Sequence, residues 1–198
     1  MAVVRRIPCV IRDVVDHGER VYTVMLQPSV AVPQFKPGQF LHLALDHYDG
    51  VGFWPESRVF SIASSPRERE HLTITYGVKG AFTTRMEREL VPGATAWAKL
   101  PYGEFVIDPA RDAVLFAGGT GVTAFTAFLK SLAPDHASRV VLFYGARTPD
   151  LFVYGPLVQA CARDVASLTC RLVCEETHGR LEVDATWPTI APLDDPVF

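Results

Sequence analysis

The sequence has no long hydrophobic run, and this absence excludes a membrane-spanning protein. Its longest apolar stretch, from Ala113 to Leu129, contains three glycines and is typical of a strand, a turn and a helix. The start of the chain carries arginines but lacks the continuous apolar segment of a secretory signal. We therefore expect a cytoplasmic protein that has no membrane partner.

The sequence also lacks a block of like charges and a pattern of paired cysteines. Its formal net charge is −3 with the two signs interspersed, whereas a nucleic-acid-binding protein needs a basic face. We therefore expect no nucleic-acid partner. The cysteines Cys9, Cys161, Cys170 and Cys174 form no C-x-x-C pair and match neither zinc nor plant-type iron–sulfur spacing. We expect reduced cysteines, packed as small hydrophobic residues, and no metal site.

What the chain does have is a large apolar fraction, 48%, which is enough for a packed core. The first hundred residues contain short β-branched runs, spaced as in a barrel or sandwich, with a hairpin at His17-Gly18-Glu19. One helix is expected at about residues 82–90. The expected strands are residues 10–15, 21–27, 40–45, 58–63, 71–76, 96–100 and 104–107.

After residue 108 the pattern alternates between strands and helices. Strands are expected over residues 113–117, 139–144 and 168–174, and a helix over residues 122–132. A second helix is expected to run to about residue 163, with Thr148 as its N-cap and Pro149 in its first turn. This order predicts a parallel sheet with right-handed crossovers. We therefore expect two domains, residues 1–108 and 109–198.

A glycine-rich turn joins the first strand of the second half to its helix. Its residues Gly119 and Gly121, with Ala124, match the dinucleotide-binding pattern, in which the backbone and the helix N-terminus approach a pyrophosphate. The acidic residue about twenty positions on, which would hold the ribose of NAD, is missing. The second strand ends instead in Arg147, which could face a 2′-phosphate or could be a solvated loop residue.

A second pattern lies in the first half, in the strand that begins at Arg58. Alternation places Arg58 and Phe60 on one side of this strand and Val59 and Ser61 on the other. A cation next to an aromatic ring could engage a phosphate and a flat ring, although an edge arginine beside a core phenylalanine is commoner. Downstream, Gly80-Ala81-Phe82-Thr83 ends a strand and opens a helix, which is either an anion site or an ordinary helix start.

Several short motifs occur together in a specific order: Lys36-Pro37-Gly38-Gln39-Phe40, Arg58-Val59-Phe60-Ser61, Gly80-Ala81-Phe82-Thr83, Pro101-Tyr102-Gly103, Ala117-Gly118-Gly119-Thr120-Gly121 and Tyr144-Gly145-Ala146-Arg147-Thr148. In this order the chain resembles the ferredoxin–NADP reductase-like flavoproteins over nearly its whole length. The resemblance implies a two-domain β plus α/β fold. An antiparallel six-stranded flavin-binding β-barrel would precede a Rossmann-like, parallel-sheet NAD(P)-binding domain, which is apparently truncated at its C-terminus.

The resemblance also implies roles for particular residues. Arg58 would bind a flavin phosphate, Phe60 would stack on the flavin where the family usually has tyrosine, and Ser61 would lie near flavin N5 as the catalytic residue. The cofactor-binding residues would be Arg58, Val59, Phe60, Ser61, Gly80, Ala81, Phe82 and Thr83 for the flavin, and Gly119, Thr120 and Gly121 for the nucleotide, to which the strand pattern adds Arg147. The cofactors would be FAD, with FMN open, and NADPH or NADH.

The implied activity is a flavin-dependent oxidoreductase that passes hydride from NAD(P)H to the flavin and electrons to an unidentified acceptor. Hydride transfer needs no general base, which agrees with the lack of a convincing catalytic histidine or carboxylate pair. The alternatives are an electron-transfer or regulatory subunit that needs a redox partner protein, and a relic that binds no flavin. In the family, the chain continues past the strand that residues 195–198 begin and forms a turn with a cysteine beside the hydride path. This sequence stops before that turn, so we expect slow reduction of the flavin by NAD(P)H.

Overall fold

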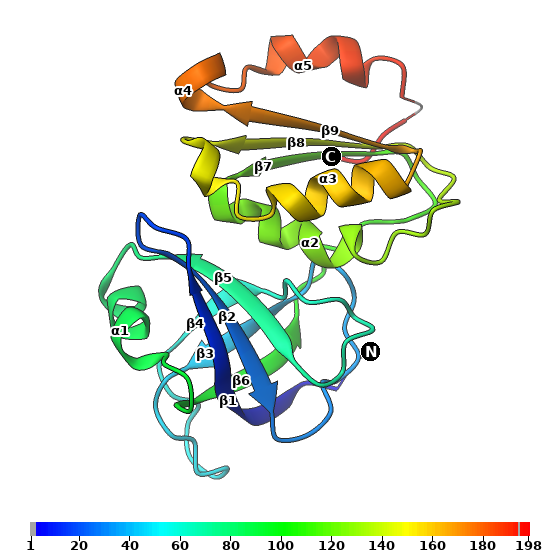
Figure 1. Cartoon of the computed structure of the whole chain (residues 1–198). Coiled ribbons are helices and arrows are strands. Elements are labelled where there is room, and N and C mark those ends of the chain that lie inside the picture. Colours follow the sequence, from blue (N-terminus) through cyan, green and yellow to red (C-terminus); the bar gives the residue numbers. More distant parts are fainter. Residues whose placement is uncertain (1–2, 194) are drawn as a thin grey trace.

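The computed structural model describes residues 3–193 and 195–198, which form two β-sheets (Figure 1). The first sheet is antiparallel, with strand order β4-β3-β6-β1-β2-β5, and the second is parallel, with order β7-β8-β9. The strands are β1 (Arg5–Asp16), β2 (Val21–Pro28), β3 (Phe40–Ala44), β4 (Ser57–Ser61), β5 (Leu72–Gly77), β6 (Thr95–Tyr102), β7 (Ala113–Gly118), β8 (Val140–Ala146) and β9 (Leu168–Cys174). The helices are α1 (Ala81–Glu89), η1 (Gly119–Val122), α2 (Thr123–Leu129), η2 (Pro149–Leu151), α3 (Gly155–Asp164), α4 (Glu175–His178) and α5 (Val183–Ile190).

The first sheet curls into a six-stranded near-barrel, as predicted. Alternate residues of its strands, such as Ile7, Leu41 and Ile74, point inward and are fully buried. The two edge strands approach each other where the Ala63 N–H donates to the Thr73 carbonyl at 2.8 Å. The predicted hairpin joins β1 to β2, and the predicted helix is α1.

One predicted strand is absent: residues 104–107 do not pair with any strand. The chain turns at Gly103, whose φ is +98°, and Phe105 then packs against the Gly38 turn. A Cβ on Gly38 would collide with the carbonyl oxygen of Phe105, so glycine is required there for this close approach. The prediction was wrong because a tertiary contact, and not strand pairing, holds this apolar segment.

The second sheet is parallel, as predicted, and it is covered on both faces, as is usual for continuous apolar strands. In Figure 1, α2 and α3 lie below it and α5 lies above it. Leu115 and Leu142 belong to the buried cluster on the side of α2 and α3, whereas Val114 and Phe143 pack with Ile190 of α5. Val197 forms an isolated parallel bridge with Ala113 at the edge of this sheet, so only one residue of the strand expected at residues 195–198 is paired. Among the described residues, none of the helices has the length and apolar character needed to cross a bilayer.

The helices of this half are shorter than predicted. The segment after β7 begins as the 3₁₀ turn η1, and α2 ends at Leu129 instead of residue 132. The helix predicted from Thr148 breaks into η2 and α3, and the Thr148 side chain makes no capping bond. At the break, Phe152 packs edge-on against Tyr144, with ring centres 5.1 Å apart, and the Tyr154 hydroxyl bonds to Thr75 at 2.7 Å. These non-local contacts outweigh local helix propensity.

The two halves pack directly on each other, with α2 between the parallel sheet and the barrel (Figure 1). Ala127 of α2 belongs to the buried cluster of the barrel, and the rings of Phe105 and Phe125 lie 6.1 Å apart. This packing brings the carboxyl ends of the parallel strands next to the end of β5.

Candidate functional site

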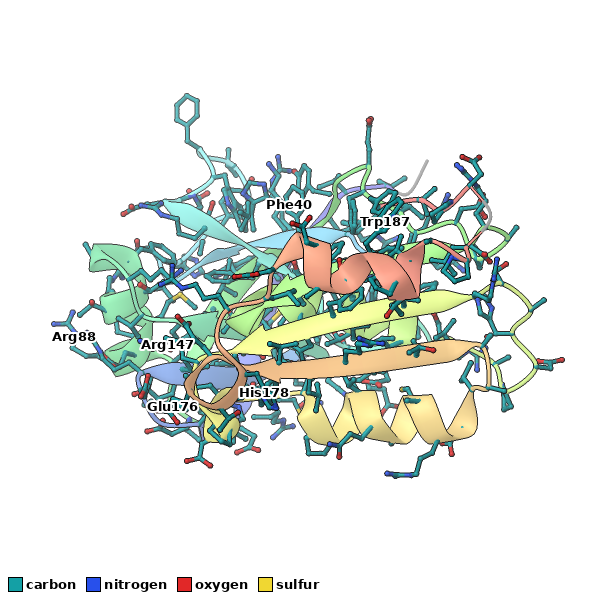
Figure 2. All side chains as sticks on the ribbon, turned by 90° about the horizontal axis from the view of Figure 1, so that it is seen from above. Phe40, Arg88, Arg147, Glu176, His178 and Trp187 are labelled. Atoms are coloured by element: carbon teal, nitrogen blue, oxygen red, sulfur yellow. The ribbon has the colours of Figure 1, made fainter. Side chains whose placement is uncertain are left out.

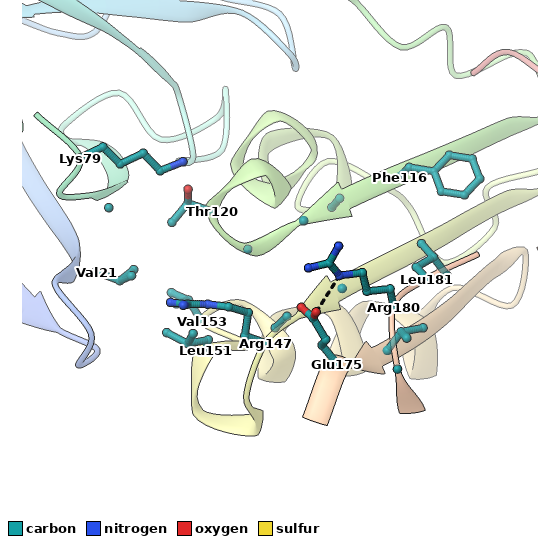
Figure 3. A pocket seen from close by; sticks show the side chains of 18 residues that line it. Val21, Lys79, Phe116, Thr120, Arg147, Leu151, Val153, Glu175, Arg180 and Leu181 are labelled. Atoms are coloured by element: carbon teal, nitrogen blue, oxygen red, sulfur yellow. Dashed lines mark hydrogen bonds and ion pairs between the residues drawn. The ribbon is translucent and has the colours of Figure 1, made fainter. Parts of the chain in front are cut away.

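A cavity of about 590 Å³ lies where the carboxyl ends of β7, β8 and β9 face the barrel (Figure 3). Open α/β sheets bind ligands at this edge. The parallel sheet contributes the glycine turn and the residues that follow β8 and β9. The barrel contributes Val21 from β2, Gly77 from the end of β5, and Lys79 from the connection to α1. Both halves of the chain therefore form one site.

The glycine turn has a backbone suited to a close approach of phosphate. Gly119 has a φ of +51°, and a Cβ added at Gly119 or Gly121 would meet nothing within 4 Å. The Thr123 hydroxyl donates to the Thr120 carbonyl at 2.9 Å and closes the first turn. Of the three predicted nucleotide residues, Gly119 and Thr120 line the cavity, whereas Gly121 does not.

Charged residues face this cavity from three elements. Arg147 follows β8, as predicted, and its Nη2 lies 2.6 Å from Glu19 Oε2 of the barrel hairpin. Glu175 follows β9 and pairs with Arg180 at 2.8 Å, which Figure 3 marks with a dashed line. Lys79 points from the barrel side toward Thr120 (Figure 3).

The sequence analysis missed Lys79, Glu175 and Arg180. Glu175 could have been found, because it follows β9 in the same way as Arg147 follows β8, and parallel strands end at one edge. The dinucleotide-binding pattern places its acidic residue after the second strand, so it does not indicate Glu175. Lys79 lies in the connection between β5 and α1 of the barrel, so no local sequence pattern links it to this cavity.

The second predicted site lies on the barrel, where β4 runs beside α1. The exposed Arg58 places its guanidinium carbon 5.0 Å from the centre of the Phe82 ring, in the first turn of α1. Arg58 also pairs with Glu56 at 2.8 Å. The structure thus brings together a cation and a helix start that are far apart in the sequence.

The start of α1 has the features of an anion site. The Thr83 hydroxyl accepts from the N–H groups of Lys79 and Gly80 at 2.9 and 3.1 Å, so it holds the turn in place. The N–H groups of a helix's first turn have no intrahelical partners, and a Cβ at Gly80 would meet nothing within 4 Å. Donors and open space therefore meet beside Arg58, and these residues fit a cofactor phosphate.

The rest of β4 follows the expected alternation. Phe60 is half-buried and packs edge-on against the buried Tyr76, with ring centres 6.1 Å apart. Val59 is 55% exposed on the opposite side. Ser61 is half-buried and lies opposite Phe40 in the β3–β4 pairing.

Two of the motifs support the end of β4. The Gln39 side chain accepts from the Lys36 N–H at 2.9 Å and donates to the Gly103 carbonyl at 2.9 Å. The Gln39 carbonyl in turn accepts from the Ile62 N–H at 3.1 Å. Gln39 therefore links the Lys36–Phe40 and Pro101–Gly103 motifs to Ile62, the residue that follows Ser61.

The cysteines are free thiols without features of a reactive site. Burial raises the pKa of Cys9 to about 12 and the pKa of Cys170 to about 12, so neither is a thiolate near neutral pH. Within the part of the chain that the structure describes, no cluster of three or more histidine, cysteine or acidic side chains is placed to hold a metal ion.

Comparisons with known proteins agree with this geometry. Residues 115–182 match the family described as the oxidoreductase NAD-binding domain. The chain is 35% identical over 134 residues to ferredoxin–NADP reductase B of Sorangium cellulosum, covering 65% of this chain and 53% of that protein. It is 32% identical over 133 residues to the probable dihydroorotate dehydrogenase B (NAD⁺) electron transfer subunit of Methanopyrus kandleri, covering 67% of this chain and 46% of that protein.

A solved structure shares the fold: an Amycolatopsis cytochrome P450 reductase superposes with a TM-score of 0.81 at 21% identity, covering 96% of this chain and 60% of that chain. The chain spans about half the length of the curated relatives that it matches. The two-sheet fold, the ordered motifs and these relatives agree, and the chain belongs to the ferredoxin–NADP reductase-like family of flavoprotein oxidoreductases.

Proposed function

We propose that this chain is a flavin-dependent NAD(P)H oxidoreductase, with a flavin-binding domain in residues 1–108 and a nucleotide-binding domain in residues 109–198. One observation carries the proposal: the glycine turn and the β5–α1 connection line the same cavity, through Thr120 and Lys79. A nucleotide on the glycine turn would therefore lie next to a flavin whose phosphate is held at the start of α1. When bound, the flavin would accept a hydride from NAD(P)H and pass the electrons to an acceptor.

The chain's own residues would bind and orient these groups. Arg58 and the first turn of α1 would neutralise and hold the flavin phosphate, and Phe60 would pack against the ring. Ser61, which lies opposite Phe40 in the β3–β4 pairing, would place its hydroxyl at the reacting edge of the ring. The backbone of Gly119 and Thr120 would hold the pyrophosphate of the nucleotide. Alignment of the two rings is the main contribution that a protein makes to such a transfer.

The flavin assignment is tested by retention of the chromophore. The purified protein should be yellow, and mass spectrometry of the released compound should give FAD, the cofactor we propose, with FMN as the alternative. Arg58→Ala should weaken flavin binding about tenfold or more, because a charge-assisted contact to phosphate contributes roughly 1.5–3 kcal/mol.

The matched control is Arg88→Ala on α1. Its side chain points away from the molecule (Figure 2) and is 71% exposed, and its only ion-pair contact among the described residues is Glu89 at 3.8 Å. This control should leave flavin content unchanged. Equal flavin retention by the Arg58 and Arg88 variants would show that Arg58 does not bind the flavin phosphate.

A second candidate is an electron-transfer subunit that turns over only with a partner protein. The similarity to an electron transfer subunit from Methanopyrus kandleri favours it. Steady-state oxidation of NADH or NADPH with a dye as acceptor separates the two candidates. Turnover by the chain alone supports an independent reductase, whereas a flavin that is reduced without turnover supports the subunit.

A further inference from the structure

The Arg147 side chain is held at the boundary between the two halves of the molecule. Its backbone is fixed, because the Arg147 carbonyl accepts from the Glu176 N–H at 3.1 Å and from the Cys174 thiol at 3.5 Å. In Figure 3 the side chain extends from the end of β8 toward the barrel residue Val21. There its Nη2 lies 2.6 Å from Glu19 Oε2.

Glu19 is held opposite Arg147 by its hairpin. Gly18, Glu19 and Arg20 have φ values of +79°, +45° and +59°, so two successive non-glycine residues adopt the unfavourable left-handed conformation. Arg20 is bound to Glu87 of α1 at 2.6 Å, and the Tyr22 hydroxyl donates to the same carboxylate at 3.0 Å. The hairpin is therefore anchored on α1, and its tip presents Glu19 to the nucleotide domain.

The other arginine of the cavity has a carboxylate partner too. Arg180 pairs with Glu175 at 2.8 Å, and both line the cavity. Lys79 is the lining cation for which no ion pair exists within residues 3–193 and 195–198. A pyrophosphate can be met by Lys79 and the N–H groups of the glycine turn without breaking an ion pair. A further phosphate near either arginine must displace a carboxylate that is already in contact.

We propose, on the basis of the proposed function, that the cavity is selective for NADH over NADPH and that Glu19, contributed by the barrel, is a determinant of this selectivity. Glu19 occupies the anion position on Arg147 and repels a 2′-phosphate that approaches it. The two nucleotides differ only in that phosphate, so a carboxylate beside Arg147 opposes one ligand and leaves the other unaffected. The specificity element therefore lies in one half of the chain and acts on a ligand bound by the other half.

The experiment is a calorimetric titration of the flavin-loaded protein with NADP⁺ and with NAD⁺, which measures binding without turnover. Glu19→Gln keeps the shape of the side chain and removes its charge. We expect its affinity for NADP⁺ to rise about fivefold, the upper value for an exposed ion pair, with NAD⁺ affinity unchanged. The rise should shrink at high salt.

Glu70→Gln is the matched control, because it makes the same charge change at an exposed barrel residue that neither lines the cavity nor pairs with Arg147. It should change neither affinity. A second comparison adds Glu19→Gln to Arg147→Ala, where its effect on NADP⁺ binding should be smaller, because the cation that it releases is gone and only the relief of charge repulsion remains.

Three results would overturn the proposal. Tighter binding of NADP⁺ than of NAD⁺ by the unchanged protein would contradict the selectivity. An equal change in both affinities on Glu19→Gln would mean that Glu19 acts only on the packing of the two halves. Failure of both nucleotides to bind to any form of the protein would overturn the proposed function and the selectivity with it.

Discussion

Tyr154→Phe should weaken the contact between the two halves of the molecule. The Tyr154 hydroxyl bonds to Thr75 of β5 at 2.7 Å, Thr75 bonds to Thr23 of β2 at 2.7 Å, and Thr23 bonds to His17 at 2.9 Å. This chain of hydrogen bonds crosses from the helix break before α3 into the barrel. The substitution removes one oxygen atom and leaves the packing of the ring in place.

The magnitude follows from the burial of Thr75, which is 5% exposed. A hydrogen bond contributes about 0.5–1.5 kcal/mol to stability, and an unsatisfied buried partner raises the loss toward roughly 1–3 kcal/mol. Thr75 keeps its bond to Thr23, so the free energy of unfolding should fall by about 1 kcal/mol. For a chain of this length the melting temperature should drop by about 2–4 °C.

The measurement is urea unfolding followed by circular dichroism, with Tyr102→Phe as the control. Tyr102 makes ring contacts, but its hydroxyl has no hydrogen-bond partner within the described residues. The control should shift the urea midpoint by much less than Tyr154→Phe. Equal midpoints for the two variants would refute the reasoning that the hydroxyl chain holds the two halves together.

Three other changes have expected outcomes. Gly38→Ala should lower the free energy of unfolding in urea by several kcal/mol more than Gly50→Ala. Both glycines have φ near +90°, but only a Cβ on Gly38 collides with the Phe105 carbonyl. Similar losses in the two variants would show that the Gly38 turn can relax. Burial lowers the pKa of His17 from its ordinary 6.5, so the folded protein binds that proton less tightly. The free energy of unfolding therefore keeps its full value above about pH 6.5 and should fall as the pH drops toward the lowered pKa of folded His17. The fall should be less steep in His17→Asn; equal slopes of unfolding free energy against pH in the two proteins would contradict this. Phe60→Tyr should keep the flavin, whereas Phe60→Ala should lose roughly 2–4 kcal/mol of stacking and burial; identical flavin spectra and retention would place Phe60 away from the ring.

The sequence by itself determined the two sheets and most of their elements. Alternating apolar residues define the barrel strands, and continuous apolar runs define β7, β8 and β9, because these patterns follow directly from burial on one face or on two. The glycine turn was also predictable, since the strand before it and the helix after it are local features. The position of Arg58 on β4 followed from the same alternation.

Only the tertiary structure decided which residues meet. Glu19 and Arg147 are 128 positions apart, and no local pattern relates a hairpin tip of the barrel to the end of β8. The break before α3 and the unpaired segment at residues 104–107 likewise depend on contacts with Thr75 and Gly38. The physical reason is that such contacts are fixed by how the two halves pack, and local propensities of about 1 kcal/mol or less are too weak to oppose them.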